Sequence, residues 1–132
     1  TGGGHIILSR KKHNDKKVLC KITKMTNTKK VPNLYDKTIK RTWIELLKGS
    51  KSELIIFSGA IDQGVNDKDE QYLKALNIPT ISIFKKYGYL GVSNLIFGII
   101  EGIKNIKNGV KSIDVIDRDV YGRESLIRLE LC

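Results

Sequence analysis

Residues 54–70 read LIIFSGAIDQGVNDKDE, and this stretch decides the fold class. Leu54 to Phe57 is a short continuous apolar run, which is typical of a strand buried on both faces of a sheet. The polar, glycine-bearing loop Ser58 to Asn66 follows and leads into a helix that we predict from Asp67 to Leu76. Acidic residues would occupy the first turn of that helix, where the helix dipole favours them: Asp67, Asp69 and Glu70.

The segments after this stretch repeat the alternation of strand and helix. Residues 79–84 predict another buried strand, and the loop 85–91 leads into a helix over 92–107, which Asn108-Gly109 ends as a C-cap. This helix is apolar around much of its circumference, so we expect it to be central and covered by a neighbour. Two alternating runs, 113–116 and 126–131, predict strands that close the chain around a turn at Tyr121-Gly122.

The segments before residue 54 add further elements. Residues 5–9 form a short apolar run headed by glycines, and residues 18–25 alternate apolar with polar side chains. We expect two strands here that form a hairpin. Residues 29–36 contain Pro32 and are expected to be loop. After them Ile39, Trp43, Leu46 and Leu47 share one face of a helix that Gly49 closes.

The element order is therefore ββαβαβαββ. Strands joined through helices predict an α/β fold whose sheet is mixed and mostly parallel, with antiparallel additions at its edge and helices on its faces. With 132 residues, of which 40% are hydrophobic, the chain is long enough for one core and too short for two ordinary ones. We expect a single domain over residues 1–132.

The composition narrows the class of protein. No apolar run reaches the roughly 20 residues of a membrane span, and the first residues lack the pattern of a signal peptide, so we expect a soluble, cytoplasmic chain with no membrane contact. Cys20 and Cys132 lie far apart without metal-ligand spacing. We favour unpaired thiols over a disulfide, and we expect neither a metal nor a cofactor.

The net charge of +10 should attract anionic partners. Nucleic acid and an acidic protein are both candidates. However, the lysines are spread along the chain with few aromatic residues between them, which is not the pattern of a base-stacking platform. Nucleic acid is therefore the less favoured partner, and a lysine-rich composition that keeps the surface solvated is the simplest alternative.

The element order and four local motifs resemble the C-terminal half of the β-ketoacyl synthases, the condensing enzymes of the thiolase fold. Residues 1–8 are similar to the family's glycine-rich approach to a strand. Residues 58–70 are similar to its loop that begins Ala-His-Gly-Thr and ends Gly-Asp-x-x-Glu. Residues 79–91 are similar to Pro-Val-x-Ser-x-Lys followed by Gly-His-x-x-Gly-Ala, and residues 120–126 stand where the family has Gly-Phe-Gly-Gly-x-Asn. The resemblance spans essentially the whole chain and implies a thiolase-like half-domain.

The resemblance also implies where catalytic residues would stand. Counting back from Glu70 places Gly59 at the first catalytic histidine of the family, and Gly88-Tyr89 falls on Gly-His, so Tyr89 replaces the second histidine. Lys85 matches the family's lysine. It would either order the floor of the pocket or be an ordinary loop residue, and we slightly favour the second. Asp67 and Glu70 likewise keep either a family role or only a favourable place at a helix start.

A decarboxylating condensation needs a cysteine thiolate and donors that stabilise an enolate. The family's cysteine comes from the other half of its fold, and neither Cys20 nor Cys132 follows a strand-to-helix elbow. Gly59 has no side-chain donor, and the phenol of Tyr89, with an ordinary pKa near 10, is a poorer proton partner than imidazole. We interpret His5 and His13 as structural or exposed. No catalytic residue is therefore assigned.

These observations predict a ketosynthase-like lobe of fatty acid or polyketide biosynthesis that resembles a chain-length factor. It would be non-catalytic alone and would act with an N-terminal ketosynthase lobe or a homologous subunit. The first alternative is the C-terminal portion of a divergent β-ketoacyl synthase that is active only beside its N-terminal lobe, because the glycine-rich opening suggests that Thr1 is not the natural start. The second is a basic nucleic-acid-binding module. Acyl carrier protein is the expected acidic partner, with Lys85 and Lys86 as its docking residues.

Overall fold

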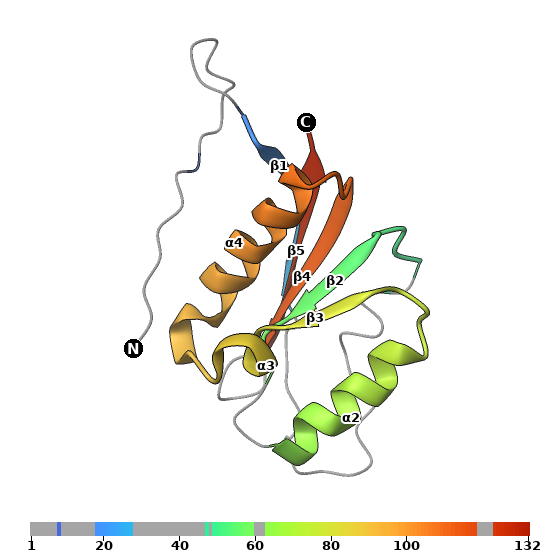
Figure 1. The fold of residues 1–132 in the computed structure, drawn as a ribbon, viewed down its shortest axis with the longest axis vertical. Coiled ribbons are helices and arrows are strands. Elements are labelled where there is room, and N and C mark those ends of the chain that lie inside the picture. The colour runs from blue at the N-terminus through green and yellow to red at the C-terminus, as the bar shows by residue number, and fades with distance from the viewer. Residues whose placement is uncertain (1–7, 9–17, 28–46, 48, 60–62, 119–122) are drawn as a thin grey trace.

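A computed structural model describes residues 8, 18–27, 47, 49–59, 63–118 and 123–132. They form a five-stranded sheet with helices on its two faces (Figure 1). The elements are β1 (Cys20–Asn27), β2 (Leu54–Phe57), α2 (Gln63–Lys74), β3 (Thr80–Ser82), α3 (Ile83–Tyr87), the 3₁₀ turn η1 (Gly91–Ser93), α4 (Asn94–Lys107), β4 (Ser112–Arg118) and β5 (Glu124–Leu131).

The strand order in the sheet is β1-β5-β4-β2-β3. Strand β2 pairs in parallel with β3 and β4, whereas β5 pairs antiparallel with both β4 and β1. Four strands therefore run in one direction and β5 runs against them, which confirms a mixed sheet. Both antiparallel pairings lie at the β1 edge of the sheet, where antiparallel additions were expected. Because β1 pairs along the outer side of β5, the antiparallel strand lies one position in from the edge.

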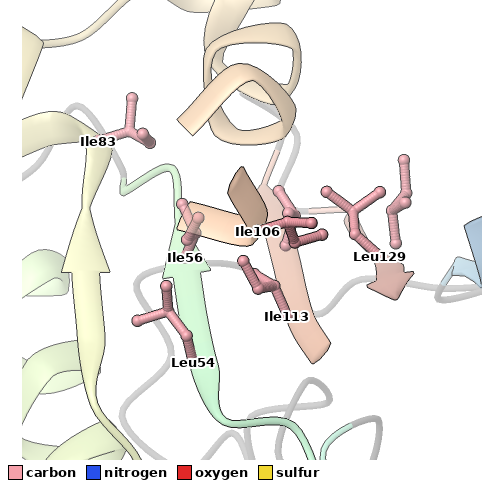
Figure 2. Close-up of a cluster of buried hydrophobic side chains, with 8 residues drawn as sticks. Leu54, Ile56, Ile83, Ile106, Ile113 and Leu129 are labelled. Carbon is pink, nitrogen blue, oxygen red and sulfur yellow. The ribbon is translucent and has the colours of Figure 1, made fainter. Parts of the chain in front are cut away.

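Each face of the sheet carries its own hydrophobic cluster because side chains alternate along every strand. The cluster between α4 and the sheet comprises Leu54, Ile56, Ile83, Ile106, Ile113, Val115, Ile127 and Leu129, six of which are labelled in Figure 2. The cluster on the opposite face comprises Leu47, Ile55, Phe57, Leu73, Ile116 and Leu126. Leu73 contributes to it from α2. All four residues of β2 are buried, as expected for a strand between two layers.

Helix α4 lies unusually close to the sheet. A Cβ atom at Gly98 would come within 2.7 Å of Cγ1 of Val115, and one at Gly102 would come within 2.7 Å of Cδ1 of Leu129. Such contacts are too short for carbon atoms, so a larger residue at either position would force the Val115 or Leu129 side chain to shift. The two glycines thus set the helix-to-sheet distance that the apolar pattern alone could not predict.

Two predicted boundaries need correction. Helix α2 begins at Gln63, four residues earlier than predicted, so its first turn contains no acidic residue, and Asp69 points inward to a buried partner. The predicted loop 85–91 begins with helix α3, because the hydroxyl oxygen of Ser82 accepts a hydrogen bond from the Lys85 N–H at 3.1 Å and caps the turn. The strand expected over 79–84 therefore ends at Ser82.

Strand β1 is one of the two edge strands of the described sheet, and β3 is the other. Its alternation is interrupted by a register shift between Ile22 and Lys24, and Met25 is 70% exposed. An irregular edge that carries lysines is a common protection against pairing with another chain. Val18–Met25 thus forms a strand as predicted, but it begins at Cys20 and buries less apolar surface than the pattern indicated.

Several predictions fall outside the described residues. Of the run 5–9, only Leu8 is described; it lies in no strand and is 73% exposed, so the expected burial is not found there. Of the helix expected from Ile39, only Leu47 is described, and it is helical and buried. The turn at residues 121–122 is not described. Within the described part of the chain, no helix is both long and apolar enough to cross a membrane.

Candidate functional site

The sheet topology indicates where a ligand site would be expected. After β2 the chain passes to α2 on one face, and after β3 it passes through α3 to α4 on the other face. Where neighbouring parallel strands lead to opposite faces, a crevice forms outside their carboxyl ends, and α/β proteins commonly bind ligands there. In this chain, Ser58 and Gly59 follow β2 at this crevice and α3 follows β3.

Helix α3 fills that crevice. Gly59 has a φ of +85°, and a Cβ atom built on it would come within 2.6 Å of the Phe84 Cβ and 3.1 Å of the Asn66 Oδ1. The Phe84 N–H also donates to the Ser58 carbonyl at 3.1 Å, which holds the two segments together. Gly59, the predicted counterpart of the first catalytic histidine, therefore supplies no side-chain donor and has no room for one.

Lys85 contacts a residue that was matched from a different motif. Its Nζ donates to Glu70 Oε2 at 2.7 Å, which joins α3 to α2. Lys85 was matched through residues 79–85, which read Pro-x-x-Ser-x-x-Lys and are one residue longer than the family's segment, and Glu70 through the end of the loop after β2. The family assignments of both residues stay predictions. An exposed pair of this kind contributes about 0–1 kcal/mol of stability.

Lys86 is paired on the opposite side of α3. Its Nζ donates to Glu101 Oε1 at 2.7 Å, and the Tyr87 hydroxyl donates to Glu101 Oε2 at 3.2 Å. Burial alone would raise the pKa of Glu101, but the hydrogen bonds and charge of Lys86, with smaller effects of Tyr87 and Lys104, hold that pKa below its ordinary value. The hydrogen bond to Glu101 correspondingly raises the pKa of Lys86.

The two lysines thus tie α3 to both layers of the fold. Figure 1 shows α3 at one end of the sheet, between α4 and α2. Lys85 reaches the helix on one face and Lys86 the helix on the other. Both predicted docking residues therefore already have carboxylate partners within the chain, which reduces the net positive charge that α3 presents.

A small pocket adjoins the crevice at the ends of β2 and β4. Its lining comprises Phe57, Ser58, Gly59, Asp69, Ile116, Asp117, Arg118 and Glu124. Of the residues predicted for the site, Gly59 lines this pocket, whereas Tyr89, Lys85 and Lys86 do not. Tyr89 is partly buried in the segment between α3 and η1. The structure thus does not bring the two histidine-equivalent positions together in one pocket.

A buried ionic cluster forms the polar wall of the pocket. The Arg118 guanidinium donates to Asp69 Oδ2 at 2.6 Å through Nη1 and to Glu124 Oε1 at 2.9 Å through Nη2 and at 3.1 Å through Nε. The exposed fractions of the three side chains are 8%, 3% and 6%. Because Arg118 and Glu124 are register partners on β4 and β5, the cluster fastens α2 to the β4–β5 pair.

This cluster was not predicted from the sequence. Asp69 was interpreted as a helix-dipole residue, and Arg118 lay beyond the predicted end of its strand. A usable signal existed, because Arg118 and Glu124 flank the turn between the last two predicted strands and would face each other in a hairpin.

Ser58 is the hydroxyl residue in the lining of the pocket, and its Oγ donates to the Gly59 carbonyl at 3.4 Å. Ser58 is 3% exposed, and its Oγ accepts the Arg118 N–H at 3.2 Å. Cys20 begins β1 and pairs in register with Leu131, so it lies at the opposite end. Burial, with the nearby Cys132, raises the pKa of Cys20 and disfavours its thiolate. In the described ranges, no group of three His, Cys, Asp or Glu side chains could hold a metal.

Comparison of the fold with solved structures gives similar chains. One belongs to the ketosynthase ApeO in complex with its chain length factor ApeC from Xenorhabdus doucetiae: the TM-score is 0.55 at 9% identity, over 88% of this chain and 80% of that one. Another belongs to AntDE:AntF, a type II polyketide synthase acyl carrier protein in complex with its ketosynthase: the TM-score is 0.52 at 14% identity, over 86% of this chain and 34% of that one. No protein-family description and no curated protein sequence matches the chain. The structural likeness shows a ketosynthase-like fold.

Proposed function

We propose that this chain is a ketosynthase-like lobe that has no condensing activity alone and acts with a partner lobe or subunit, in the manner of a chain-length factor in polyketide or fatty acid biosynthesis. The observation that carries the proposal is the presence of a tightly packed glycine, Gly59, at the position matched to the family's first catalytic histidine. A catalytic donor is absent there, and the packing of Phe84 leaves no space for one. The likeness to chains from ketosynthase complexes supports the same assignment.

The outer face of α4 supports the need for a partner. Leu95, Phe97 and Ile99 pack on the core below the helix, but Ile96, Ile100 and Ile103 are partly exposed and are not among the side chains packed on that core. Val92, one turn before Ile96, is 98% exposed. These apolar residues recur at helical spacing, and a continuous apolar stripe on a surface is typical of a contact with another protein.

Self-association tests this interpretation. We expect the chain alone to dimerise or aggregate in light scattering, and the double variant Ile96→Glu with Ile100→Glu to shift the population toward monomer. Lys68→Glu with Lys74→Glu, on α2, is a control that also adds negative charge. A wild-type chain that stays monodisperse and monomeric would count against a missing partner lobe.

Activity is tested with malonyl-loaded acyl carrier protein. The chain alone should release no carbon dioxide above background, because it has no histidine equivalent at Gly59 and no cysteine elbow among the described residues. Turnover by the chain alone would refute the proposal. Turnover only after an N-terminal ketosynthase lobe is added would favour the alternative of a divided but active synthase.

The same carrier protein tests the docking residues. Charge reversal of Lys85 and Lys86 should weaken carrier binding more than reversal of Lys11 and Lys12 if α3 is the docking element. The ion pairs with Glu70 and Glu101 predict a modest effect, since a carrier must compete with carboxylates already in place. Equal losses in the two double variants would exclude specific docking on α3.

A further inference from the structure

Exposed lysines gather at the end of the molecule opposite to α3. Lys104 and Lys107 lie in the last turn of α4, Lys111 follows the turn before β4, and Lys51 precedes β2; all four are exposed. We call these four residues the basic pole. Figure 1 shows that this end of α4 lies at the far end of the sheet from α3.

Backbone contacts bring the segments of the basic pole together. The Glu53 N–H donates to the Ser112 carbonyl at 2.9 Å, and the Lys111 N–H donates to Glu53 Oε2 at 2.9 Å. The Val110 N–H donates to the Asn105 carbonyl at 3.1 Å, which folds the turn back onto α4. Lys51 and Lys111 therefore lie on adjacent segments, close to the end of α4.

The charges of the pole are not neutralised as those of α3 are. Within the described part of the chain, no ion pair joins the ammonium groups of these four lysines to a carboxylate, whereas Lys85 and Lys86 are each bound to one. Glu53 is the acidic residue within these segments, and its carboxylate accepts a backbone N–H. Two further carboxylates lie beside them: Glu101, whose pKa the charge of Lys104 lowers, and Glu130, the register partner of Ser112. Positive charge in excess of nearby carboxylates attracts anions most strongly at such a surface.

The surroundings of the pole distinguish between two kinds of anionic partner. The described residues between these lysines, in 49–53 and 104–112, include no exposed large apolar side chain. Leu131, which is 45% exposed, donates its N–H to the Lys111 carbonyl, and the partly exposed Ile103 precedes Lys104. Protein interfaces are organised around buried apolar anchors, whereas here the exposed apolar side chains lie beside the lysines and not among them. Contacts to a phosphate backbone need only cations and polar donors, and Asn105, Asn108 and Ser112 are polar residues of these segments.

We propose that the basic pole binds the phosphate backbone of nucleic acid without regard to base sequence. Direct reading of bases is not part of the proposal, because the pole has no aromatic side chain on which a base could stack. The inference does not depend on the proposed ketosynthase-like function and concerns a different surface.

The test is binding of a DNA duplex of about 20 base pairs, measured by fluorescence anisotropy over a range of salt concentrations. If four lysines each neutralise one phosphate, the logarithm of the binding constant should fall with the logarithm of salt with a slope of about −3.6. Lys107→Glu with Lys111→Glu should lower affinity at least about tenfold near 0.1 M salt and reduce the slope by about 2.

Lys68→Glu with Lys74→Glu is the matched control, because it changes the net charge equally at exposed positions of α2. It should lower affinity less than about threefold and leave the slope unchanged. Circular dichroism checks that both double variants fold. If one does not, the same two lysines are replaced by glutamine instead of glutamate. Equal losses in the two doubles, absence of duplex binding by the wild-type chain, or displacement of duplex by polyglutamate at equal charge concentration would each overturn the proposal.

Discussion

Replacement of Gly59 by alanine tests whether α3 excludes a side chain from the crevice after β2. The structure predicts two separate costs. A φ of +85° is unfavourable for any residue with a Cβ by about 1–2 kcal/mol, and the contact with the Phe84 Cβ at 2.6 Å forces a shift that costs about 1–3 kcal/mol. We therefore expect Gly59→Ala to lower the free energy of unfolding by about 2–5 kcal/mol, and Gly59→His to lower it further.

Two other glycines separate these costs. Gly109 has a φ of +105° with nothing within 4 Å of its Cβ position, so Gly109→Ala should show only the backbone cost of about 1–2 kcal/mol. Gly98 has no unusual φ, but a Cβ there would lie 2.7 Å from Val115 Cγ1. Gly98→Ala should therefore show the packing cost, reduced by about 1 kcal/mol because alanine favours a helix more than glycine does.

The assay is urea denaturation followed by far-ultraviolet circular dichroism, with all variants at one protein concentration because self-association would change apparent stability. The reasoning is refuted if Gly59→Ala lies within about 0.5 kcal/mol of the wild type, the range of an ordinary surface substitution. It is also refuted if Gly59→Ala costs no more than Gly109→Ala, since the contact with Phe84 would then have no consequence.

Two further perturbations test the ionic groups around the crevice. Asp69→Asn should destabilise the fold by about 1–3 kcal/mol, because it removes one charged partner of the buried Arg118 while Glu124 remains as the other. The same kind of change at the next residue, Glu70→Gln, should cost at most about 1 kcal/mol, because its pair with Lys85 is exposed. Equal losses in urea titrations would contradict the assignment of Arg118 as the link between α2 and the β4–β5 pair. The second perturbation concerns Glu101, whose pKa is lower in the folded chain than in the unfolded chain. Its ionised form therefore stabilises the fold fully above the ordinary glutamate pKa of about 4.3. This contribution is lost as the pH falls through the folded-state pKa. Below about pH 4.3, the free energy of unfolding from urea titrations should therefore fall less steeply with pH for Glu101→Gln than for the wild type. An equally steep fall for the two proteins would exclude this role of Glu101.

The periodicity of the sequence was sufficient to predict most strands of the described sheet and helix α4. Apolar runs at 54–57 and 113–116 became the buried strands β2 and β4, and the spacing over 92–107 became α4, because burial on two faces or along one helical stripe leaves a direct trace in residue order. The structure also places Glu70 and Lys85 in contact, but the matches of these two residues to family motifs stay predictions.

Only the tertiary structure decided the features that depend on residues distant in the chain. The position of β5 inside the sheet follows from the pairing of β1 with its outer side, a choice that no local pattern encodes. The fully buried Asp114 breaks an apolar strand pattern, yet it is stable there because Arg128 lies opposite it on β5 and bonds it at 2.8 Å. Gly59 could be aligned with a histidine from sequence alone, but the contact with Phe84 that excludes a side chain exists only after α3 has closed over the strand ends. Local propensity acts over a few residues, whereas charge pairing and steric exclusion act between surfaces that folding brings together.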